Sequence, residues 1–294
     1  MEEEKVEMTP SPDDESREGS SFSEMSFWNH LEDLRWTIFR MAVALAVCVV
    51  AAFAVMPWVF DNFILAPTTS DFFLYRFFAG LGGKIPFLPD FGDGDFSVSI
   101  ININVASQFL THISTSFWLA LVLAFPYMIY EIWKFVRPAL FPAEVKNMRM
   151  AFLFGTVMFY IGCTVGYCIV FPFTFRFLVE YKLSEHVVNQ INLSSYIGNF
   201  IMMIFVMGLV FELPLLAWIL SKVGIINRKF LVGYRRYAVV VLLVLAAVIT
   251  PSGDPFTLSV VFLPLYMLYE LSILLVRKDL PAGKDDDGAE AEEQ

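Results

Sequence analysis

The sequence predicts an all-α integral membrane protein with six transmembrane helices and both termini on the cytoplasmic side. Three observations support this prediction: 57% of the residues are hydrophobic, apolar runs of about 20 residues recur along the chain, and basic connections alternate with base-poor ones. A soluble chain of 294 residues would be less apolar, so we expect the bilayer to be its solvent.

The formal net charge of −10 belongs to the two ends of the chain. Residues 1–24 carry nine acids and two bases, residues 277–294 carry seven acids and three bases, and the region between them carries +1. We therefore predict two acidic, disordered cytoplasmic tails, 1–24 and 277–294, around a membrane domain of residues 25–276. Because this acidity lies in tails, it does not indicate a nucleic-acid partner. The acidic start also lacks the basic region of a signal peptide, so the first span should be retained.

The cysteines and histidines do not form a pattern that supports metal binding or catalysis. Cys48, Cys163 and Cys168 all lie inside apolar runs and are predicted to be packing residues. His112 and His186 lie at or outside the span boundaries, and no nucleophile–base pair can be assigned. The sequence therefore predicts no metal site, no cofactor and no enzyme activity.

The six predicted spans cover residues 37–57, 112–136, 151–171, 196–220, 237–250 and 256–276. Residues 58–111 and 173–194 are expected to form outer loops, the first with short helices against the bilayer surface. We predict that the third span ends at Pro172. This span contains Gly162-x-x-x-Gly166, a spacing that lets a neighbouring helix approach closely.

The fifth and sixth spans are predicted to be short. At 1.5 Å per residue, residues 237–250 would reach about 21 Å, against a hydrocarbon core of about 30 Å. Residues 251–255, Pro-Ser-Gly-Asp-Pro, then turn the chain tightly. A bilayer around such short spans should thin locally.

The distribution of lysine and arginine predicts the orientation. Bases gather at the amino-terminal flank, in the connections after spans two and four, and at the carboxyl-terminal flank, whereas the outer loops carry few. Because cytoplasmic connections carry the excess of bases, both termini are predicted to be cytoplasmic.

The segment before the first span combines an apolar helix face with two acids. Apolar residues recur at i, i+4, i+7 and i+11 from Phe27, while Glu32 and Asp33 lie on the opposite side. This pattern predicts a helix that lies in the membrane interface and then turns to cross. The two carboxylates would face cytoplasmic water, which is a poor place for anions unless a cation meets them.

Two further acids have both a structural and a functional interpretation. Glu144 follows Pro142 in the predicted first turn of span three, where the helix dipole favours an anion. Glu212 is the one ionisable group near mid-span, so it should face a helix interface or a wet cavity, or stay protonated. A helix–helix hydrogen bond near the Pro214 kink, a docking point for a partner helix and a proton relay all remain open for it. Glu270, near the cytoplasmic end of span six, is expected to snorkel.

Taken in chain order, several motifs resemble those of the TatC family, the integral subunit of the twin-arginine protein translocase. Each motif is weak alone, but together they cover about residues 26–276. The motifs are His30-Leu31-Glu32-Asp33-Leu34-Arg35, Tyr130-x-x-Trp133-x-Phe135-x-x-Pro138-Ala139-Leu140-x-x-x-Glu144, Phe171-Pro172, Phe211-Glu212-Leu213-Pro214, and Thr250-Pro251 followed by Asp254.

The resemblance implies a receptor in the bacterial cytoplasmic membrane for folded proteins that carry an Arg-Arg signal peptide. It further implies small single-span partner subunits of the TatA/TatB type, a self-oligomer within a complex, and export driven by the protonmotive force. By position, Asp33 and Glu144 match the acids that bind the paired arginines in the family. The family usually has Glu at the position of Asp33. Glu32 stands beside it, so either of the two could make the contact.

The same motifs imply roles for several neighbouring residues. Arg35 and Phe135 are implied to belong to the signal-peptide site, and Pro251 and Asp254 to a turn that the family shares. Glu131 stands where relatives commonly carry Gln, so it should add an anion to the cytoplasmic face.

The chemistry of the paired arginines agrees with two carboxylates. A guanidinium pairs bidentately with a carboxylate, which an ammonium cannot copy. Two adjacent arginines need at least two carboxylates, so such a site should distinguish Arg-Arg from Lys-Lys. The main alternative is a multi-spanning secondary transporter that uses Glu212, although no internal repeat is visible in the sequence. An isolated structural scaffold is the other alternative, and it would not need Asp33 and Glu144 to be anionic.

Overall fold

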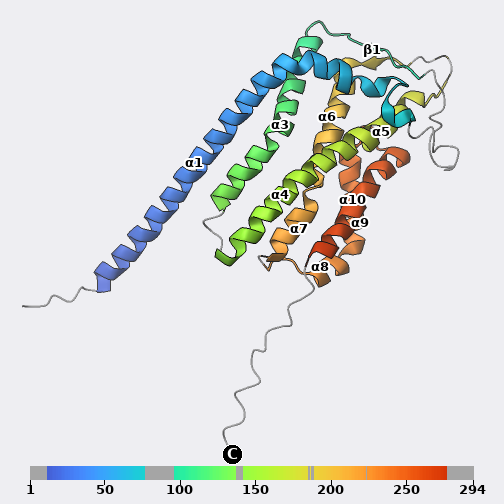
Figure 1. Ribbon diagram of the computed structural model, residues 1–294. Coiled ribbons are helices and arrows are strands. Elements are labelled where there is room, and N and C mark those ends of the chain that lie inside the picture. The colour runs from blue at the N-terminus through green and yellow to red at the C-terminus, as the bar shows by residue number, and fades with distance from the viewer. Residues whose placement is uncertain are drawn as a thin grey trace, which may run out of the picture.

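A computed structural model describes residues 12–76, 96–136, 142–184, 186, 189–222 and 224–276, with side chains for all of these except 12–30, 136, 142–149 and 151. Long helices run side by side in a bundle, and α1 extends beyond the others at one end (Figure 1). The helices are α1 (Pro12–Val59), α3 (Ser107–Val136), α4 (Pro142–Val165), α5 (Phe171–Glu180), α6 (Leu193–Val210), α7 (Leu213–Lys222), α8 (Arg228–Gly233), α9 (Arg235–Ile249) and α10 (Pro255–Leu275). Shorter elements are the π-helices η1 (Phe60–Ile64) and η4 (Gly166–Val170), the 3₁₀ turn η2 (Ala66–Thr68), and the strands β1 (Ile100–Ile101) and β2 (Ile191–Asn192).

Helix α1 is continuous through the boundary predicted between an interfacial helix and the first span. The sequence between Gly19 and Pro57 contains neither glycine nor proline, so nothing interrupts the helical hydrogen bonds there. The predicted turn before the crossing is therefore wrong, and residues 12–24, predicted to be a disordered tail, have a helical backbone. Residues 1–11 and 277–294 lie outside the described residues.

The third span does not end at Pro172. Helix α4 passes through η4 directly into α5, which extends to Glu180. Pro172 lies in the first turn of α5, where the missing N–H is tolerated, and the π-helix before it changes the hydrogen-bond register. The prediction of an outer loop from residue 173 is therefore wrong for residues 173–180.

Span four is broken, and span six has its predicted length but is not short. Phe211 and Glu212 form a turn between α6 and α7, and Pro214 follows in the first turn of α7. Helix α9 has 15 residues and is short, as predicted, whereas α10 has 21 residues and can span a hydrocarbon core. Pro264 lies inside α10 without ending it, so the prediction of a short sixth span is wrong.

By length and composition, five stretches among the described residues can cross a membrane. They are Leu31–Thr68, Ser107–Phe135, Phe152–Glu180, Leu193–Lys222 and Pro255–Leu275. The remaining predicted span corresponds to α9, which is shorter than these five.

Gly162 and Gly166 of the third span allow α4 and η4 to pack closely on α6. A Cβ atom at Gly162 would lie 2.7 Å from the carbonyl oxygen of Met207, and one at Gly166 would lie 2.9 Å from Cα of Ile204. Both distances are shorter than real contacts allow, so only glycine fits this packing. The predicted close approach of a neighbouring helix is confirmed.

Segments at the end of the bundle that holds β1 and β2 are tied together by contacts between distant parts of the chain. Strands β1 and β2 pair in parallel, with Ile100 opposite Ile191. The Tyr167 hydroxyl donates to the carbonyl of Phe63 at 3.0 Å, and the Tyr196 hydroxyl donates to that of Ile64. These tyrosines satisfy carbonyls of a π-helix, whose hydrogen bonds depart from the α-helical pattern.

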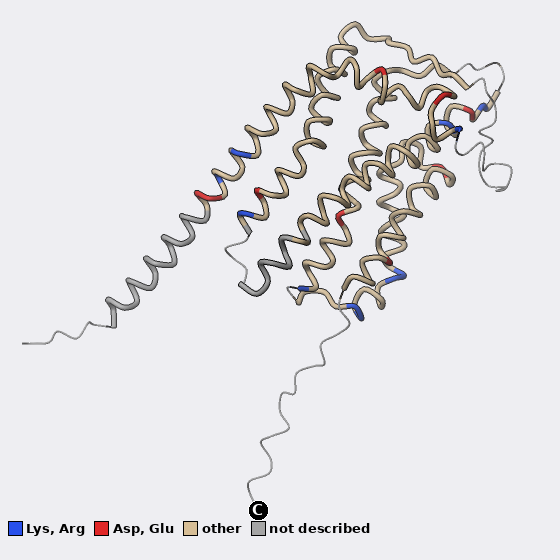
Figure 2. The backbone as a smooth tube through the Cα atoms, in the orientation of Figure 1, with Lys and Arg blue, Asp and Glu red and all other residues tan. Residues whose placement is uncertain are grey.

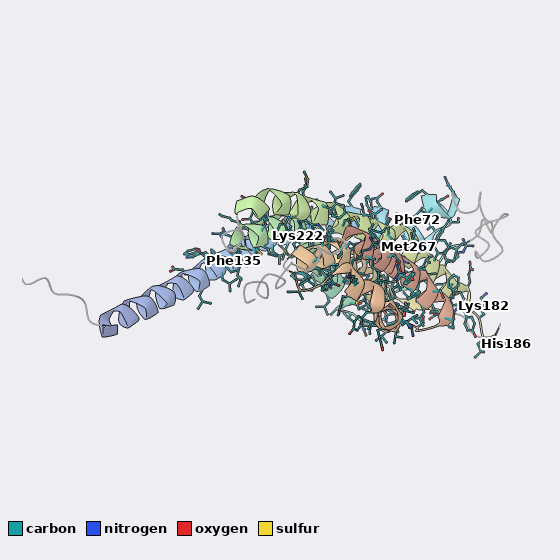
Figure 3. The ribbon with its side chains drawn as sticks, turned by 90° about the horizontal axis from the view of Figure 1, so that it is seen from below. Phe72, Phe135, Lys182, His186, Lys222 and Met267 are labelled. Carbon is teal, nitrogen blue, oxygen red and sulfur yellow. The ribbon has the colours of Figure 1, made fainter. Side chains whose placement is uncertain are left out.

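Most charged residues gather toward the two ends of the bundle, and one acidic position lies between them, near the junction of α6 and α7 (Figure 2). Phe135 and Lys222 lie toward the end from which α1 extends, and Lys182 and His186 lie at the opposite end (Figure 3). The end of α3, the start of α4 and the end of α7 are therefore on one side of the bundle (Figure 1).

Candidate functional site

The acids of the first motif lie exposed on α1. Glu32, Asp33 and Arg35 are exposed, whereas Leu34 is half-buried and Thr37 is buried. Asp33 lies one helical turn before Thr37, on nearly the same face of α1, and is exposed at the end of the bundle where α1 extends beyond the other helices. Neither acid has an ion-pair partner among the described residues, so both carboxylates are open to a ligand.

The second predicted acid lies in the first turn of α4. Helix α4 begins at Pro142, as the sequence predicts, which places Glu144 among the free N–H groups of the helix start. The side chain of Glu144 lies outside the described residues. Phe135, the other predicted contact, is half-buried in the last turn of α3.

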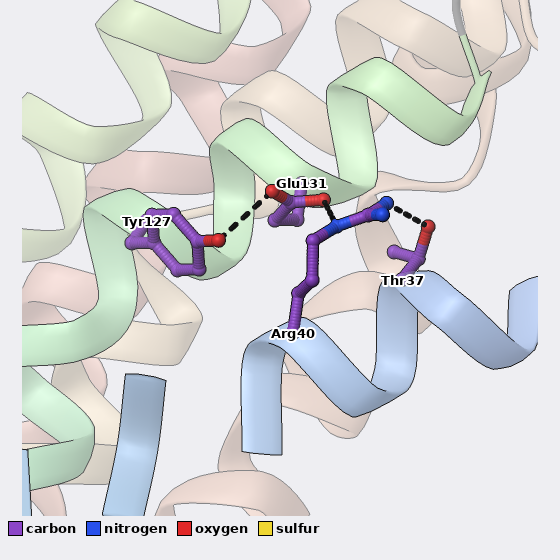
Figure 4. Close-up of polar contacts among 4 residues, drawn as sticks. All are labelled: Thr37, Arg40, Tyr127 and Glu131. Carbon is purple, nitrogen blue, oxygen red and sulfur yellow. Dashed lines mark hydrogen bonds and ion pairs between the residues drawn. The ribbon is translucent and has the colours of Figure 1, made fainter. Parts of the chain in front are cut away.

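Glu131 is not an additional anion on the surface, contrary to the prediction. Its residue is 3% exposed, and Oε2 accepts a hydrogen bond from Arg40 Nε at 2.9 Å (Figure 4). Tyr127 Oη donates to Oε1 at 3.0 Å, and Arg40 also donates to Thr37 Oγ1 at 3.1 Å. The carboxylate therefore links α3 to α1, and its charge is neutralised within the protein.

Glu212 points from the α6–α7 turn toward α4. A Cβ atom at Gly155 would lie 2.8 Å from Glu212 Oε2, so the carboxyl group packs against this part of α4. Oε1 is buried and has no hydrogen-bond partner among the described residues. The predicted location at a helix interface is confirmed, and the described residues provide no partner for the helix–helix hydrogen bond.

The turn between α9 and α10 is organised by Asp254. Gly253 adopts a φ of 59°, which glycine tolerates, and Asp254 then caps α10 by accepting from the backbone N–H of Thr257 at 2.9 Å. The Thr257 and Ser252 hydroxyls also donate to this carboxylate. Burial by itself would raise the pKa of Asp254, but these hydrogen bonds outweigh it and hold the pKa below its usual range.

Glu270 has partners inside the protein, which the sequence did not predict. Arg235 donates to its Oε2 at 2.7 Å and Tyr266 Oη donates to its Oε1 at 3.1 Å. The carboxylate therefore joins the start of α9 to the end of α10.

Sequence reasoning missed a buried cation at the opposite end. Arg176 on α5 is 1% exposed, and its guanidinium lies 4.9 Å from the ring centroid of Phe96 and 5.4 Å from that of Tyr75. Its Nε donates to Glu180 Oε1 at 2.6 Å. The only sequence signal was the Arg–Glu spacing of four residues, because the aromatic partners come from a distant loop.

Comparison with known proteins agrees with the motifs. The sequence model of the family described as Sec-independent protein translocase protein (TatC) matches residues 29–264. A protein named Sec-independent protein translocase protein TatC from Blattabacterium sp. subsp. Periplaneta americana is 35% identical over 255 residues, which cover 86% of this chain and 95% of that one. A protein of the same name from Deinococcus radiodurans is 34% identical over 251 residues, 85% of either chain.

A solved structure extends the similarity to the fold. A crystal structure described as "Twin Arginine Translocase Receptor- TatC" superposes with a TM-score of 0.64 at 25% identity, over 84% of this chain and 97% of that chain. These matches favour a translocase protein over the alternative of a secondary transporter that uses Glu212. The chain belongs to the TatC family of Sec-independent protein translocase proteins.

Proposed function

We propose that this subunit of the Tat translocase is the receptor that binds Arg-Arg signal peptides of folded proteins and supports their export by the protonmotive force. The observation that carries the proposal is the exposed pair Glu32 and Asp33 on α1, at the end of the bundle where α3 ends and α4 begins with Glu144. The solved relative's description as a twin-arginine translocase receptor supports the same role.

The state of the other acids at this end favours Glu32 and Asp33 as ligands. Glu131 and Glu270 already accept hydrogen bonds from arginines of the chain, whereas Glu32 and Asp33 have no such partner among the described residues. Each arginine of the peptide can form a bidentate pair with one carboxylate. Glu144, on a separate helix, supplies the second carboxylate. Its place at a helix start favours the ionised carboxyl group whether or not a peptide is bound.

Arg35 and Phe135 flank this two-part site. Arg35 is exposed two residues after Asp33, and Phe135 occupies the last turn of α3. In this proposal Phe135 contacts the apolar part of the peptide.

We further propose that α9 is the sixth crossing and that both termini face the cytoplasm of a bacterium, with the chain in the inner membrane. The bases of the described connections support this orientation, because they gather at the end that holds Lys134, Lys222 and Arg228. Cysteine labelling from either side tests it: Ala143 and Asn227 should react from the cytoplasm, and Asn189 from outside. Labelling of Ala143 from outside would contradict both the orientation and the receptor role.

Glu212 is proposed as the polar docking point for the transmembrane helix of a small single-span partner. Its buried Oε1 has no hydrogen-bond partner in the described part of the chain, so a polar group of an incoming helix can supply one. The same complex would hold several copies of this chain.

Photocrosslinking tests the receptor role. A photoreactive residue at position 33 or 144, in native membranes, should crosslink to an Arg-Arg signal peptide and much less to its Lys-Lys counterpart. A photoreactive residue at Ile113, which is exposed on α3 near the opposite end, is the matched control and should not crosslink. Equal crosslinking of both peptides at position 33 would show that the receptor site lies elsewhere.

A further inference from the structure

The connection from α7 to α9 carries five bases, Lys222, Arg228, Lys229, Arg235 and Arg236, of which three are considered together. Lys222 ends α7, Arg228 begins α8 and Arg236 lies in the first turn of α9. We call these three residues the basic platform. Arg235 is excluded because Glu270 already neutralises it. Arg228 and Arg236 have no ion-pair partner among the described residues. The charges of the platform are therefore available to an anionic ligand.

The chain leaves α10 directly against this platform. Val276, the last described residue, is 2% exposed and packs with Leu231 of α8 and Ile273 of α10. The Tyr269 hydroxyl donates to the carbonyl of Leu231 at 2.7 Å, which holds α8 on α10. Basic positions of α7, α8 and α9 gather at the end of the bundle where α10 ends (Figure 2). The described part of the chain therefore ends beside α8.

The sequence beyond that point ends in a block of negative charge. Residues 285–294 carry six acids and no base: Asp285, Asp286, Asp287, Glu290, Glu292 and Glu293. The nine-residue step from Val276 to Asp285 spans up to about 30 Å when extended. Helix α8 is only about 9 Å long, so the acids can reach Arg228 at its start. Tethering also gives them an effective concentration in the millimolar range.

We propose that residues 285–294 dock on the basic platform of the same chain and screen it from anionic lipid headgroups. The exposed aromatic side chains of Phe230, Tyr234 and Tyr237 stand beside the cations, so an unscreened platform would be suited to the interface of an anionic membrane. A single exposed ion pair contributes little, so the contact rests on several pairs at once and is weakened by salt. This proposal does not depend on the role of Glu32, Asp33 and Glu144.

The test is a photoreactive residue at Asp286 in the full chain, reconstituted in bilayers of zwitterionic lipid. The expected product is a crosslink within one chain to residues 222–237. The double variant Arg228→Glu/Arg236→Glu should lower the crosslink yield about three- to tenfold. Raising the salt concentration to about 0.5 M, where screening acts within a few ångströms, should also lower it. Lys134→Glu makes the same kind of charge change at the end of α3 and should leave the yield unaltered.

Reversing the charges on both partners distinguishes loss of the contact from a variant that merely disturbs the fold. Changing Asp285, Asp287 and Glu290 to lysine should abolish the crosslink in the otherwise unaltered chain, and should restore it in the Arg228→Glu/Arg236→Glu chain. The proposal is overturned if the crosslink forms mainly to lipid, to a second copy of the chain or outside residues 222–237. A yield that the double variant leaves unchanged would equally overturn it.

Discussion

Arg40 on α1 donates a hydrogen bond of 2.9 Å to Glu131 on α3, across 91 residues of sequence. The two side chains differ in exposure, because 38% of the arginine side chain and only 4% of the glutamate side chain reach solvent. A carboxylate in this position stays charged only while a cation stands beside it, so the pair holds α1, which carries Glu32 and Asp33, against α3, which carries Phe135.

The unequal burial predicts unequal costs for removing either partner. Arg40→Met should lower the free energy of unfolding by about 3 kcal/mol, because it leaves a buried carboxylate without its cation. Glu131→Gln should cost only about 1 kcal/mol, because the half-exposed guanidinium can turn to water. Unfolding in mixed detergent micelles measures both, and Tyr127→Phe, which removes one neutral donor, is the control. Equal losses in the free energy of unfolding for the two variants would show that the difference in burial does not determine the cost of removing a partner.

Asp33 and Glu144 are predicted to act as one two-part arginine site. Asp33→Ala or Glu144→Ala should weaken binding of an Arg-Arg peptide about ten- to a hundredfold, which corresponds to roughly 1.5–3 kcal/mol, and leave membrane insertion intact. Asp33→Glu should be nearly silent and Asp33→Asn should resemble Ala. If Glu32 is the ligand, Glu32→Ala will show the loss and Asp33→Ala will not.

The same variants can be combined with changes in the peptide. Once a peptide arginine is changed to lysine, removing its own carboxylate partner should cost little more, which a double-mutant cycle measures. If every acidic variant loses Arg-Arg and Lys-Lys binding equally, the acids are only cap and interface residues.

Glu212 is predicted to act through hydrogen bonding. Glu212→Gln should retain much of the export activity, because an amide keeps donor and acceptor groups at the α4 interface, whereas Glu212→Ala and Glu212→Lys should impair it. Export of a reporter with an Arg-Arg signal peptide is the measurement. A Gln variant as inactive as Ala would instead indicate a carboxyl group that must titrate.

The close approach of α4 and α6 predicts different results for two glycines. Gly162→Ala should destabilise the protein by about 1–3 kcal/mol, because the new Cβ would overlap the Met207 carbonyl and the Phe211 side chain. Gly198→Ala, on α6, meets nothing within 4 Å and should be neutral or stabilising, because alanine favours a helix. Thermal unfolding in detergent compares the two. A loss of stability in Gly198→Ala as large as that in Gly162→Ala would contradict the packing argument.

Asp254 is predicted to stabilise the start of α10 in a pH-dependent manner. Asp254→Ala should cost about 1 kcal/mol through the lost helix cap. Because the folded-state pKa of Asp254 is held below its usual value, the charge contributes stability above the unfolded-state pKa and loses it as the pH falls through the folded-state pKa. Asp254→Asn should keep the cap and abolish this acid-range dependence, as unfolding at neutral and acidic pH would reveal. An acid-range dependence that persists in Asp254→Asn would assign it to another group.

The sequence predicted those features that depend on short stretches of chain. Apolar runs located the long helices, although several helix ends differ from the predicted ones by five residues or more, Pro142 marked a helix start, and Gly162 and Gly166 indicated a close helix contact. The continuous course of α1 was also visible locally, because the sequence between Gly19 and Pro57 has no residue that breaks a helix. The predicted turn there relied on an amphipathic pattern that a straight helix can carry equally well.

By itself, the sequence determined the all-helical membrane class, the family and the candidate acids, because hydropathy and motif spacing are properties of neighbouring residues. Only the tertiary structure decided which acids remain open to a ligand. Glu131 and Glu32 are both acids near the same end of the bundle, yet Arg40 neutralises the first and the second stays exposed. The physical reason is that pairing and burial depend on side chains brought together from distant segments, whose positions no local pattern encodes.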